Sequence, residues 1–342
     1  MDQPPQISGQ KKKNLNLTRD EIRKHLLLEK ERESQEPKDG IKRMTPETRT
    51  INSRRVTFVG ASHIFNASET EKQSLKQQLD ATLDEFATET QNNPVTYIIE
   101  GEIPKDQDLE NLPDHEAALV VKKAKQSSNP DVKYISGDPN KAELFSRIKD
   151  SSEFTVDLKK INIEGFGEFN NSDLALLYFF FRDCKLEDSS PKNIIFLINF
   201  VSQFQNTNFF KSEELQNIVK SIENANKMTD SEKTAFLAKI QPFINQILEK
   251  IKKVQEYFEK QYPGMSVSEI IENYDSENNS NPQENLRSGV YQMATIVRRE
   301  RDVYLLEKIQ AETQDNRDVI TVFGSSHQIR TRKALDMMTE KE

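Results

Sequence analysis

The sequence predicts an α/β protein whose mainly parallel sheet is built in two halves, with helices on its faces and a central helical insert. Between residues 54 and 140, short apolar β-branched runs alternate with segments of helical period, which is the pattern of βαβ units. A similar apolar run recurs at 318–324, and a long stretch of helical character separates it from the others. We therefore expect one α/β domain interrupted by a helical segment.

Composition limits the classes of protein to which the chain can belong. Its 342 residues are enough for a large core. A net charge of -8 argues against general affinity for nucleic acid. The chain has no apolar run long enough for a membrane span and no signal-peptide core at its start. The single cysteine, Cys184, excludes an intramolecular disulfide. We expect a cytoplasmic protein with no nucleic-acid partner and no membrane span.

Residues 1–50 are predicted to form a mobile charged tail. Lys, Glu, Gln and Pro take the place of an apolar period there. Within this tail, Thr18 and Glu21 form a capping-box pattern ahead of a small apolar cluster. The pattern predicts one short charged helix around His25, most simply a solvated one.

The first half of the α/β domain is predicted to span residues 51–140. Short runs rich in β-branched and aromatic residues predict three strands, and segments of helical period predict two helices between them. The strands are expected at 55–60, 95–100 and 132–138, and the helices at 69–89 and 115–127.

Residues 141–285 are predicted to be a mainly helical insert. A capping-box pattern at 229–232 opens a long amphipathic stripe that stops at Pro263 and Gly264, which predicts one long helix. Apolar runs at 174–181 and 194–201 are also expected to be helical, although periodicity alone does not separate helix from strand there.

The second half of the α/β domain is predicted to span residues 286–342. A long helix is expected at 286–312, a strand at 318–324 and a final helix at 330–338. The strand closely matches the first strand of the chain in composition.

Two nearly identical segments carry the strongest signal for a functional site. VTFVGASH at 56–63 and ITVFGSSH at 320–327 each close a predicted strand on glycine and place a histidine three residues later, His63 and His327. With 10 Gly and 4 His in the chain, chance predicts about 0.1 Gly-x-x-His matches. The glycine permits a sharp turn, and the carboxyl edge of a parallel sheet is where ligands bind. A histidine in this position can also be an ordinary hydrogen-bonded residue, but the duplication favours a site.

Acidic residues follow two other predicted strands. Glu100 ends the strand at 95–100, Glu102 comes two residues later, and Asp138 ends the third strand. If the strands are parallel neighbours, Glu100 shares an edge with both histidines. Two imidazoles and a carboxylate can hold a divalent metal such as manganese, cobalt, iron or zinc, with Asp138 as a further ligand or an orienting residue. The alternative for Glu100 and Asp138 is helix N-capping.

The predicted helix from residue 286 carries charge on its apolar stripe. Between Val297 and Tyr304 the stripe position falls on Glu300 or Arg301. Because a buried charge needs a partner, Arg301 is expected to meet a carboxylate, a metal-bound anion or a transition-state oxyanion. A structural ion pair, or an arginine that snorkels past the stripe, is the alternative.

Together these segments resemble the TraB/PrgY and TIKI-like group of metal-dependent hydrolases, and more distantly the ChaN and erythromycin-esterase proteins. The resemblance covers 54–140 and 286–338 and rests on the order strand-Gly-x-x-His, strand-Glu, Glu-Arg-Asp at 300–302, and a second strand-Gly-x-x-His. It implies a two-half α/β fold with a site at the strand ends and, for the TIKI members, metal-dependent peptide hydrolysis. His63, Glu100, Arg301 and His327 match the positions expected to build that site. The acidic strand end reads Glu-Gly-Glu at 100–102, where TraB-like chains usually have Glu-Leu-Asp.

Three hypotheses follow. The first is a metal-dependent hydrolase, a peptidase among the options, acting on a peptide or a small ester or amide through a metal-activated water. Its metal ligands are expected to be His63, His327, Glu100 and Asp138, and its catalytic residues Glu100, Glu102 and Arg301. The second is a metal-free, esterase-like hydrolase in which a histidine activates water and Glu100 orients it. The third is a non-catalytic scaffold or effector that binds protein partners through the helical insert.

Overall fold

The computed structural model describes residues 16–27, 44–61, 68–101, 103, 116–149, 173–174, 177–178, 229–265 and 285–339. Contacts within the chain divide it into two compact units. The first consists of residues 1–139 and 301–342, and the second of residues 140–300.

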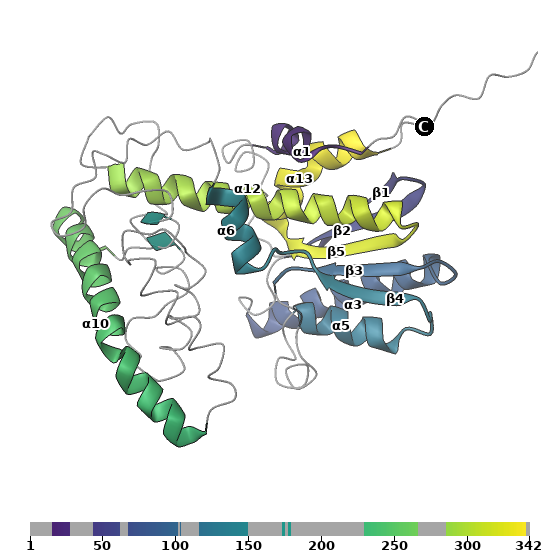
Figure 1. The fold of residues 1–342 in the computed structure, drawn as a ribbon. Coiled ribbons are helices and arrows are strands. Elements are labelled where there is room, and N and C mark those ends of the chain that lie inside the picture. The colour runs from purple at the N-terminus through teal and green to yellow at the C-terminus, as the bar shows by residue number, and fades with distance from the viewer. Residues whose placement is uncertain are drawn as a thin grey trace, which may run out of the picture. The chain divides into compact units, whose positions relative to one another are not determined.

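The first unit is a mixed α/β structure around a five-stranded, mostly parallel sheet (Figure 1). Its spatial order is β1-β2-β5-β3-β4, with β1 antiparallel to β2 and all other neighbours parallel. The strands are β1 (Thr45–Ile51), β2 (Arg54–Ala61), β3 (Val95–Ile99), β4 (Val132–Ser136) and β5 (Asp318–Gly324). The α/β class and the mainly parallel sheet are thus confirmed.

The strand that comes last in the chain, β5, lies between β2 and β3. Ala61 of β2 pairs with Gly324 of β5, and Ile99 of β3 pairs with Val322. Because β2, β3, β4 and β5 are parallel, their carboxyl ends meet at one edge of the sheet. Residues that follow these strands are therefore brought together although they are far apart in sequence.

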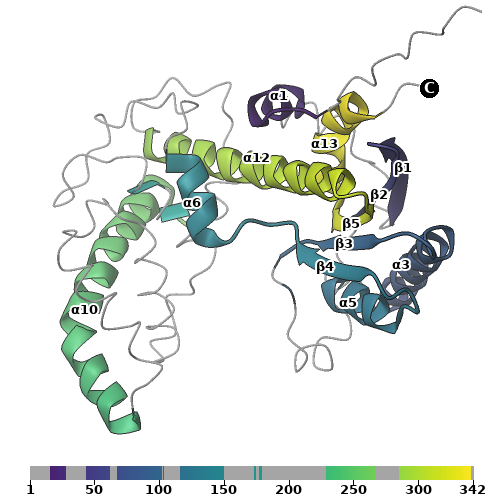
Figure 2. The ribbon, with the colours of Figure 1, turned by 45° about the vertical axis from the view of Figure 1, so that its right-hand side comes forward.

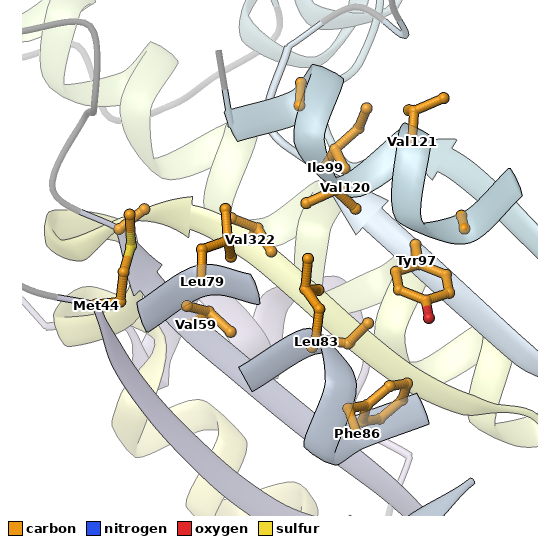
Figure 3. Close-up of a cluster of buried hydrophobic side chains, with 14 of the residues drawn as sticks. Met44, Val59, Leu79, Leu83, Phe86, Tyr97, Ile99, Val120, Val121 and Val322 are labelled. Atoms are coloured by element: carbon orange, nitrogen blue, oxygen red, sulfur yellow. The ribbon is translucent and has the colours of Figure 1, made fainter. Parts of the chain in front are cut away.

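Helices cover both faces of this sheet (Figures 1 and 2). On one face, α3 (Glu69–Glu89) and α5 (Glu116–Gln126) pack against the strands, and on the other lie α1 (Arg19–His25), α13 (Ser325–Met338) and the part of α12 (Asn285–Gln314) that begins at Arg301. The α3 helix buries a stripe at helical spacing, formed by Leu75, Leu79, Leu83 and Phe86. Figure 3 shows Leu79 and Leu83 of α3 beside Val59 of β2 and Val322 of β5.

Two elements lie inside the segment that the sequence predicts as a mobile tail. The predicted helix around His25 is confirmed as α1, with the capping box between Thr18 and Glu21. This helix is docked rather than solvated, because Ile22 and Leu26 are buried in the core of the first unit. The backbone of Leu17 also exchanges two hydrogen bonds with the side chain of Gln310.

The other element is the edge strand β1, which the sequence analysis did not predict. Along Thr45–Ile51 the residues alternate between exposed and partly buried, and only Ile51 is fully buried. An edge strand with Pro46 and two charged residues, Glu47 and Arg49, resembles a polar linker in sequence. It pairs with a neighbour on one side only and so tolerates proline and charge.

The remaining predicted elements of the first unit are confirmed, with differences at the third predicted strand and at the last helix. The strand β4 ends at Ser136, so Asp138 follows it instead of ending it. The α13 helix begins at Ser325, five residues before the predicted start. Its extension places His327 in the first helical turn instead of a connecting loop.

The second unit contains α6 (Lys141–Lys149), α10 (Asp230–Gln261) and the residues of α12 up to Glu300. The long helix predicted after residue 229 is confirmed as α10, including its capping box and its end before Pro263. Of the run 174–181 only Leu174, Leu177 and Tyr178 are described, all three helical, and the run 194–201 lies outside the described residues. Within the described parts of the chain, none of the helices combines the length and apolar character needed to cross a bilayer.

Candidate functional site

Four of the six predicted site residues are described, and they gather at the carboxyl edge of the sheet. Glu100 directly follows β3, Asp138 lies two residues beyond β4, His327 is in the first turn of α13, and Arg301 projects from α12. The other two, His63 and Glu102, lie outside the described residues.

The Glu100 carboxylate connects the strand ends. Its Oε2 accepts a hydrogen bond from the backbone N–H of Gly324, at 2.7 Å, where β5 passes into α13. Its Oε1 accepts from Nη2 of Arg301 at 2.9 Å and lies 3.4 Å from Nε2 of His327. The side chain keeps 23% of its exposure, so this carboxylate is reachable from solvent.

Arg301 is held by two carboxylates. Its Nε and Nη2 donate to the two oxygens of Asp138, each at 2.7 Å, in addition to the bond from Nη2 to Glu100. This is the bidentate geometry in which a guanidinium binds a carboxylate most strongly. The expected carboxylate partner of Arg301 is therefore present, and it is provided by the protein itself.

Asp138 is engaged on both oxygens. In addition to the two bonds from Arg301, its Oδ2 accepts from the backbone N–H of Gly101 at 2.8 Å. The residue therefore fits the orienting role considered for it, because both of its oxygens are directed at protein donors.

On its Nδ1 side, His327 contacts a buried ion pair between Asp302 and Arg330 that the sequence analysis did not include in the site. Its Nδ1 is hydrogen-bonded to Oδ1 of Asp302, whose side chain is 0% exposed. Arg330 donates from Nε to Oδ2 of the same carboxylate at 2.5 Å. Because an ionised carboxylate only accepts, its hydrogen bond with Nδ1 calls for a proton on that nitrogen, and Nε2 faces Glu100. Nη2 of Arg330 lies 3.1 Å from the same Nδ1.

The aromatic ring of Phe323 and the small size of Gly137 complete the wall beside His327. The Phe323 ring packs at 75° to the imidazole, with 5.6 Å between the ring centroids. A Cβ at Gly137 would come within 2.5 Å of the Phe323 ring. Glycine at 137 therefore makes room for the side chain that packs against the histidine.

The charges at this edge alter the pKa values of its members. Burial by itself would raise the pKa of Glu100, but His327, Arg301 and the Gly324 N–H together hold it well below its ordinary value. Burial would lower the pKa of His327, yet the charges of Asp302 and Glu100 and their hydrogen bonds raise it. Burial likewise opposes ionisation of Asp302, and Arg330 and His327 reverse that effect and lower its pKa. The site thus favours two ionised carboxylates beside a protonated imidazole.

Two side chains here could bind a divalent metal once His327 has lost the proton on Nε2, because both would then offer a lone pair. Among the described residues, no group of three His, Cys, Asp or Glu side chains could hold a metal ion. Glu100 Oε1 and His327 Nε2 are 3.4 Å apart, which matches the roughly 3.4 Å between two donors that bind a tetrahedral ion at about 2.1 Å each. These two residues fit part of a metal site, and a third protein donor would come from a residue that is not described, such as His63.

Asp302 and Arg330 had a weak signal in the sequence. The stripe on α12 singled out positions 300 and 301, but the next turn of this helix is buried on several sides, including Val303, Leu305 and Leu306. A charged residue off the stripe can therefore be as buried as one on it. The spacing of His327 and Arg330, three residues apart on a helix, also indicated a shared face.

No family model, curated protein or solved structure matches this chain.

Proposed function

We propose that this protein is a hydrolase of ester or amide bonds, peptides included, in which Glu100 and His327 activate the attacking water together with a divalent metal ion. The observation that carries the proposal is the approach of Glu100 Oε1 to His327 Nε2, 3.4 Å apart at the carboxyl edge of a parallel sheet. The same activity is what the sequence resemblance to the TraB/PrgY and TIKI-like group implies.

In this proposal Glu100 and His327 hold the metal, with His63 as the third ligand. Manganese, cobalt, iron and zinc all accept such a donor set. A bound ion of this kind lowers the pKa of a water ligand and so supplies a hydroxide nucleophile near neutral pH.

Arg301 and Asp138 orient Glu100 in this proposal. Three N–H groups of Arg301 are directed at protein carboxylates, so its charge is already neutralised where an oxyanion would need it. The positive charge instead keeps Glu100 ionised, which both metal binding and water activation require. Glu102 remains a candidate proton carrier in this proposal.

The second candidate is a metal-free hydrolase in which the Glu100–His327 pair moves the proton unaided. The observation that favours it is the charge balance of the edge. Among the described residues of this edge, Glu100, Asp138 and Asp302 carry three negative charges, and Arg301, Arg330 and a protonated His327 carry three positive ones. A group of side chains that is neutral without an ion has less need of a cation.

The test combines metal content with hydrolysis on the purified full-length chain. We expect elemental analysis to find near-stoichiometric manganese, cobalt, iron or zinc, and a panel of fluorogenic peptides and aryl esters to be hydrolysed in a chelator-sensitive manner. His327→Gln and His63→Gln should both lose the metal. Asp318→Asn, a buried aspartate at the other end of β5, should keep it.

The outcomes separate the candidates. Chelator-resistant hydrolysis that is lost in His327→Gln would favour the metal-free form. Absence of both metal and hydrolysis would overturn the enzyme proposal and leave the scaffold hypothesis, in which the predicted insert at 141–285 binds a protein partner. In the enzyme proposal the same predicted insert, which separates the two halves of the α/β domain in sequence, is the candidate region for substrate selection.

A further inference from the structure

The Asp302 carboxylate is the most deeply buried charge at the carboxyl edge, and the proposed reaction assigns it no task. Its side chain is 0% exposed, and those of His327 and Arg330 are 7% and 4% exposed. A buried carboxylate is costly unless hydrogen-bonded donors surround it. The groups that contact this carboxylate, His327 and Arg330, therefore indicate its role.

Helix geometry explains why one carboxylate reaches both partners. His327 and Arg330 are three residues apart on α13, so their side chains lie on the same face and can both approach Asp302 on α12. Arg301 and Asp302 are consecutive on α12 and diverge, with Arg301 directed to Glu100 and Asp302 to His327. One turn of α12 thus holds both members of the Glu100–His327 pair.

The division of the two Asp302 oxygens goes beyond what a structural ion pair requires. Oδ2 accepts from Nε of Arg330 at 2.5 Å, while Oδ1 is directed at Nδ1 of the histidine. Nη2 of Arg330 lies 3.4 Å from Oδ1 and 3.1 Å from Nδ1. In a simple ion pair the guanidinium would take both oxygens at similar distances. Here the stronger arginine contact fixes one oxygen and leaves the other for the imidazole.

We propose that Asp302, held in place by Arg330, is a positioning residue that fixes the Nδ1–H tautomer and the ring orientation of His327, so that Nε2 is directed at Glu100. The edge-on contact with Phe323 limits rotation of the ring in the same sense. A histidine that binds metal or moves a proton through one ring nitrogen is commonly oriented by a hydrogen bond at the other. The inference rests on the proposed function only in treating His327 as a functional group.

The decisive variant is Asp302→Asn, which keeps the shape of the side chain. An amide offers one oxygen and one NH2 group. Arg330 only donates and so takes the oxygen, which leaves the NH2 group facing Nδ1 of His327. Nδ1 must then accept, and the neutral ring is expected to switch to the Nε2–H tautomer.

Long-range proton–nitrogen NMR on the metal-free full-length chain, labelled with 15N-histidine, distinguishes the two tautomers and needs no substrate. The spectrum is recorded at a pH above the titration of His327. The chain has only four histidines, and His25→Gln, His63→Gln and His115→Gln assign the His327 signal by elimination. We expect the Nδ1–H form to predominate in the natural chain and the Nε2–H form in Asp302→Asn.

Asp318→Asn is the matched control. Asp318 is a buried aspartate on the amino end of β5 whose oxygens accept from the backbone N–H of Arg55 at 2.9 Å and from Asn93 at 2.6 Å. The same change of charge there should leave the His327 tautomer unaltered.

Three results would overturn the inference: an Nε2–H tautomer in the natural chain, an Nδ1–H tautomer that persists in folded Asp302→Asn, or the same switch in Asp318→Asn. The natural-chain spectrum remains decisive if Asp302→Asn does not fold. Absence of metal and hydrolysis would contradict the proposed function without changing the tautomer of His327. The experiments therefore test the proposed function and the positioning role of Asp302 independently.

Discussion

Both edges of the sheet hold networks of charged side chains, but among the described residues only the network at the carboxyl edge includes a histidine. At the amino edge, Arg317 donates to the backbone carbonyls of Val95 and Asp131 and to the side chains of Thr96 and Asp131, and Asp318 accepts from the backbone N–H of Arg55 and the side chain of Asn93. At the carboxyl edge, the bonds of Arg301 and Arg330 run to the side chains of Glu100, Asp138 and Asp302. We call these two groups, including His327 in the second, the amino-edge cluster and the carboxyl-edge cluster.

The difference indicates what each edge is for. The amino-edge side chains bond to one another and to the backbone of strand starts and loops, which stabilises the fold. In the carboxyl-edge cluster an imidazole lies between the carboxylates of Glu100 and Asp302, so that the charges there also shift the pKa values of reactive groups. The carboxyl-edge cluster therefore has the properties of a site, and the amino-edge cluster those of a structural network.

The largest expected effect concerns catalysis. His327→Gln and Glu100→Gln should each lower kcat by about 100- to 10,000-fold, the usual contribution of a positioned proton-transfer group. Arg317→Gln at the amino edge should leave kcat within a few-fold while lowering the melting temperature. Steady-state kinetics on the best substrate from the hydrolysis panel measures both. An equal loss of kcat in folded Arg317→Gln would contradict the assignment of the active site to the carboxyl edge.

The next effect concerns stability. Asp302→Ala removes the shared partner of two buried cationic groups and should cost about 3–5 kcal/mol of unfolding free energy. Arg317→Ala loses hydrogen bonds of a charged group that is nearer to solvent, and a cost of about 1.5–3 kcal/mol is expected. Urea denaturation followed by circular dichroism compares the two. A smaller loss of unfolding free energy in Asp302→Ala than in Arg317→Ala would mean that the carboxyl-edge cluster contributes less to stability than the amino-edge cluster.

Metal binding should stabilise only through the carboxyl edge. At 100 times its dissociation constant, an ion bound to the native state alone raises the unfolding free energy by about 2.7 kcal/mol. Differential scanning calorimetry with added manganese or zinc should show this gain in the natural chain and in Asp318→Asn, but not in His327→Gln. An equal gain in His327→Gln would place the ion elsewhere.

The smallest effect concerns pH. The pKa values of Glu100 and Asp302 are lowered, so the stability they contribute is present above their ordinary values of 4.5 and 3.8 and is lost as the pH falls through the lowered values. The pKa of His327 is raised, so its contribution is complete below its ordinary value of 6.5 and is lost as the pH rises through the raised value.

The carboxyl-edge cluster should therefore contribute most between these limits, at roughly pH 5 to 6. Each unit by which a pKa is shifted corresponds to about 1.4 kcal/mol. Melting temperatures recorded across pH for the natural chain and His327→Gln should differ most in this range and converge at alkaline pH. A difference that stays constant up to alkaline pH would show that His327 stabilises the fold by packing and not by charge.

Much of the fold and part of the site could be read from local pattern. The α3 helix was predicted at 69–89 and has those bounds, because its four buried residues repeat at helical spacing. Glu100 and His327 were singled out because each follows an apolar strand. The docking of α1 and the edge strand β1 were missed, because their burial depends on surfaces formed by α12, α13 and β2.

The sequence by itself determined most of the elements and the residue types at the strand ends, because the spacing of apolar and polar residues follows from which side of each element is buried. Only the tertiary structure decided the partners. Arg301 meets Asp138 and Glu100 across 163 and 201 residues of sequence, and Asp302 meets His327 across 25. Such pairs form because β5 inserts between β2 and β3, and no local pattern specifies which strands become neighbours.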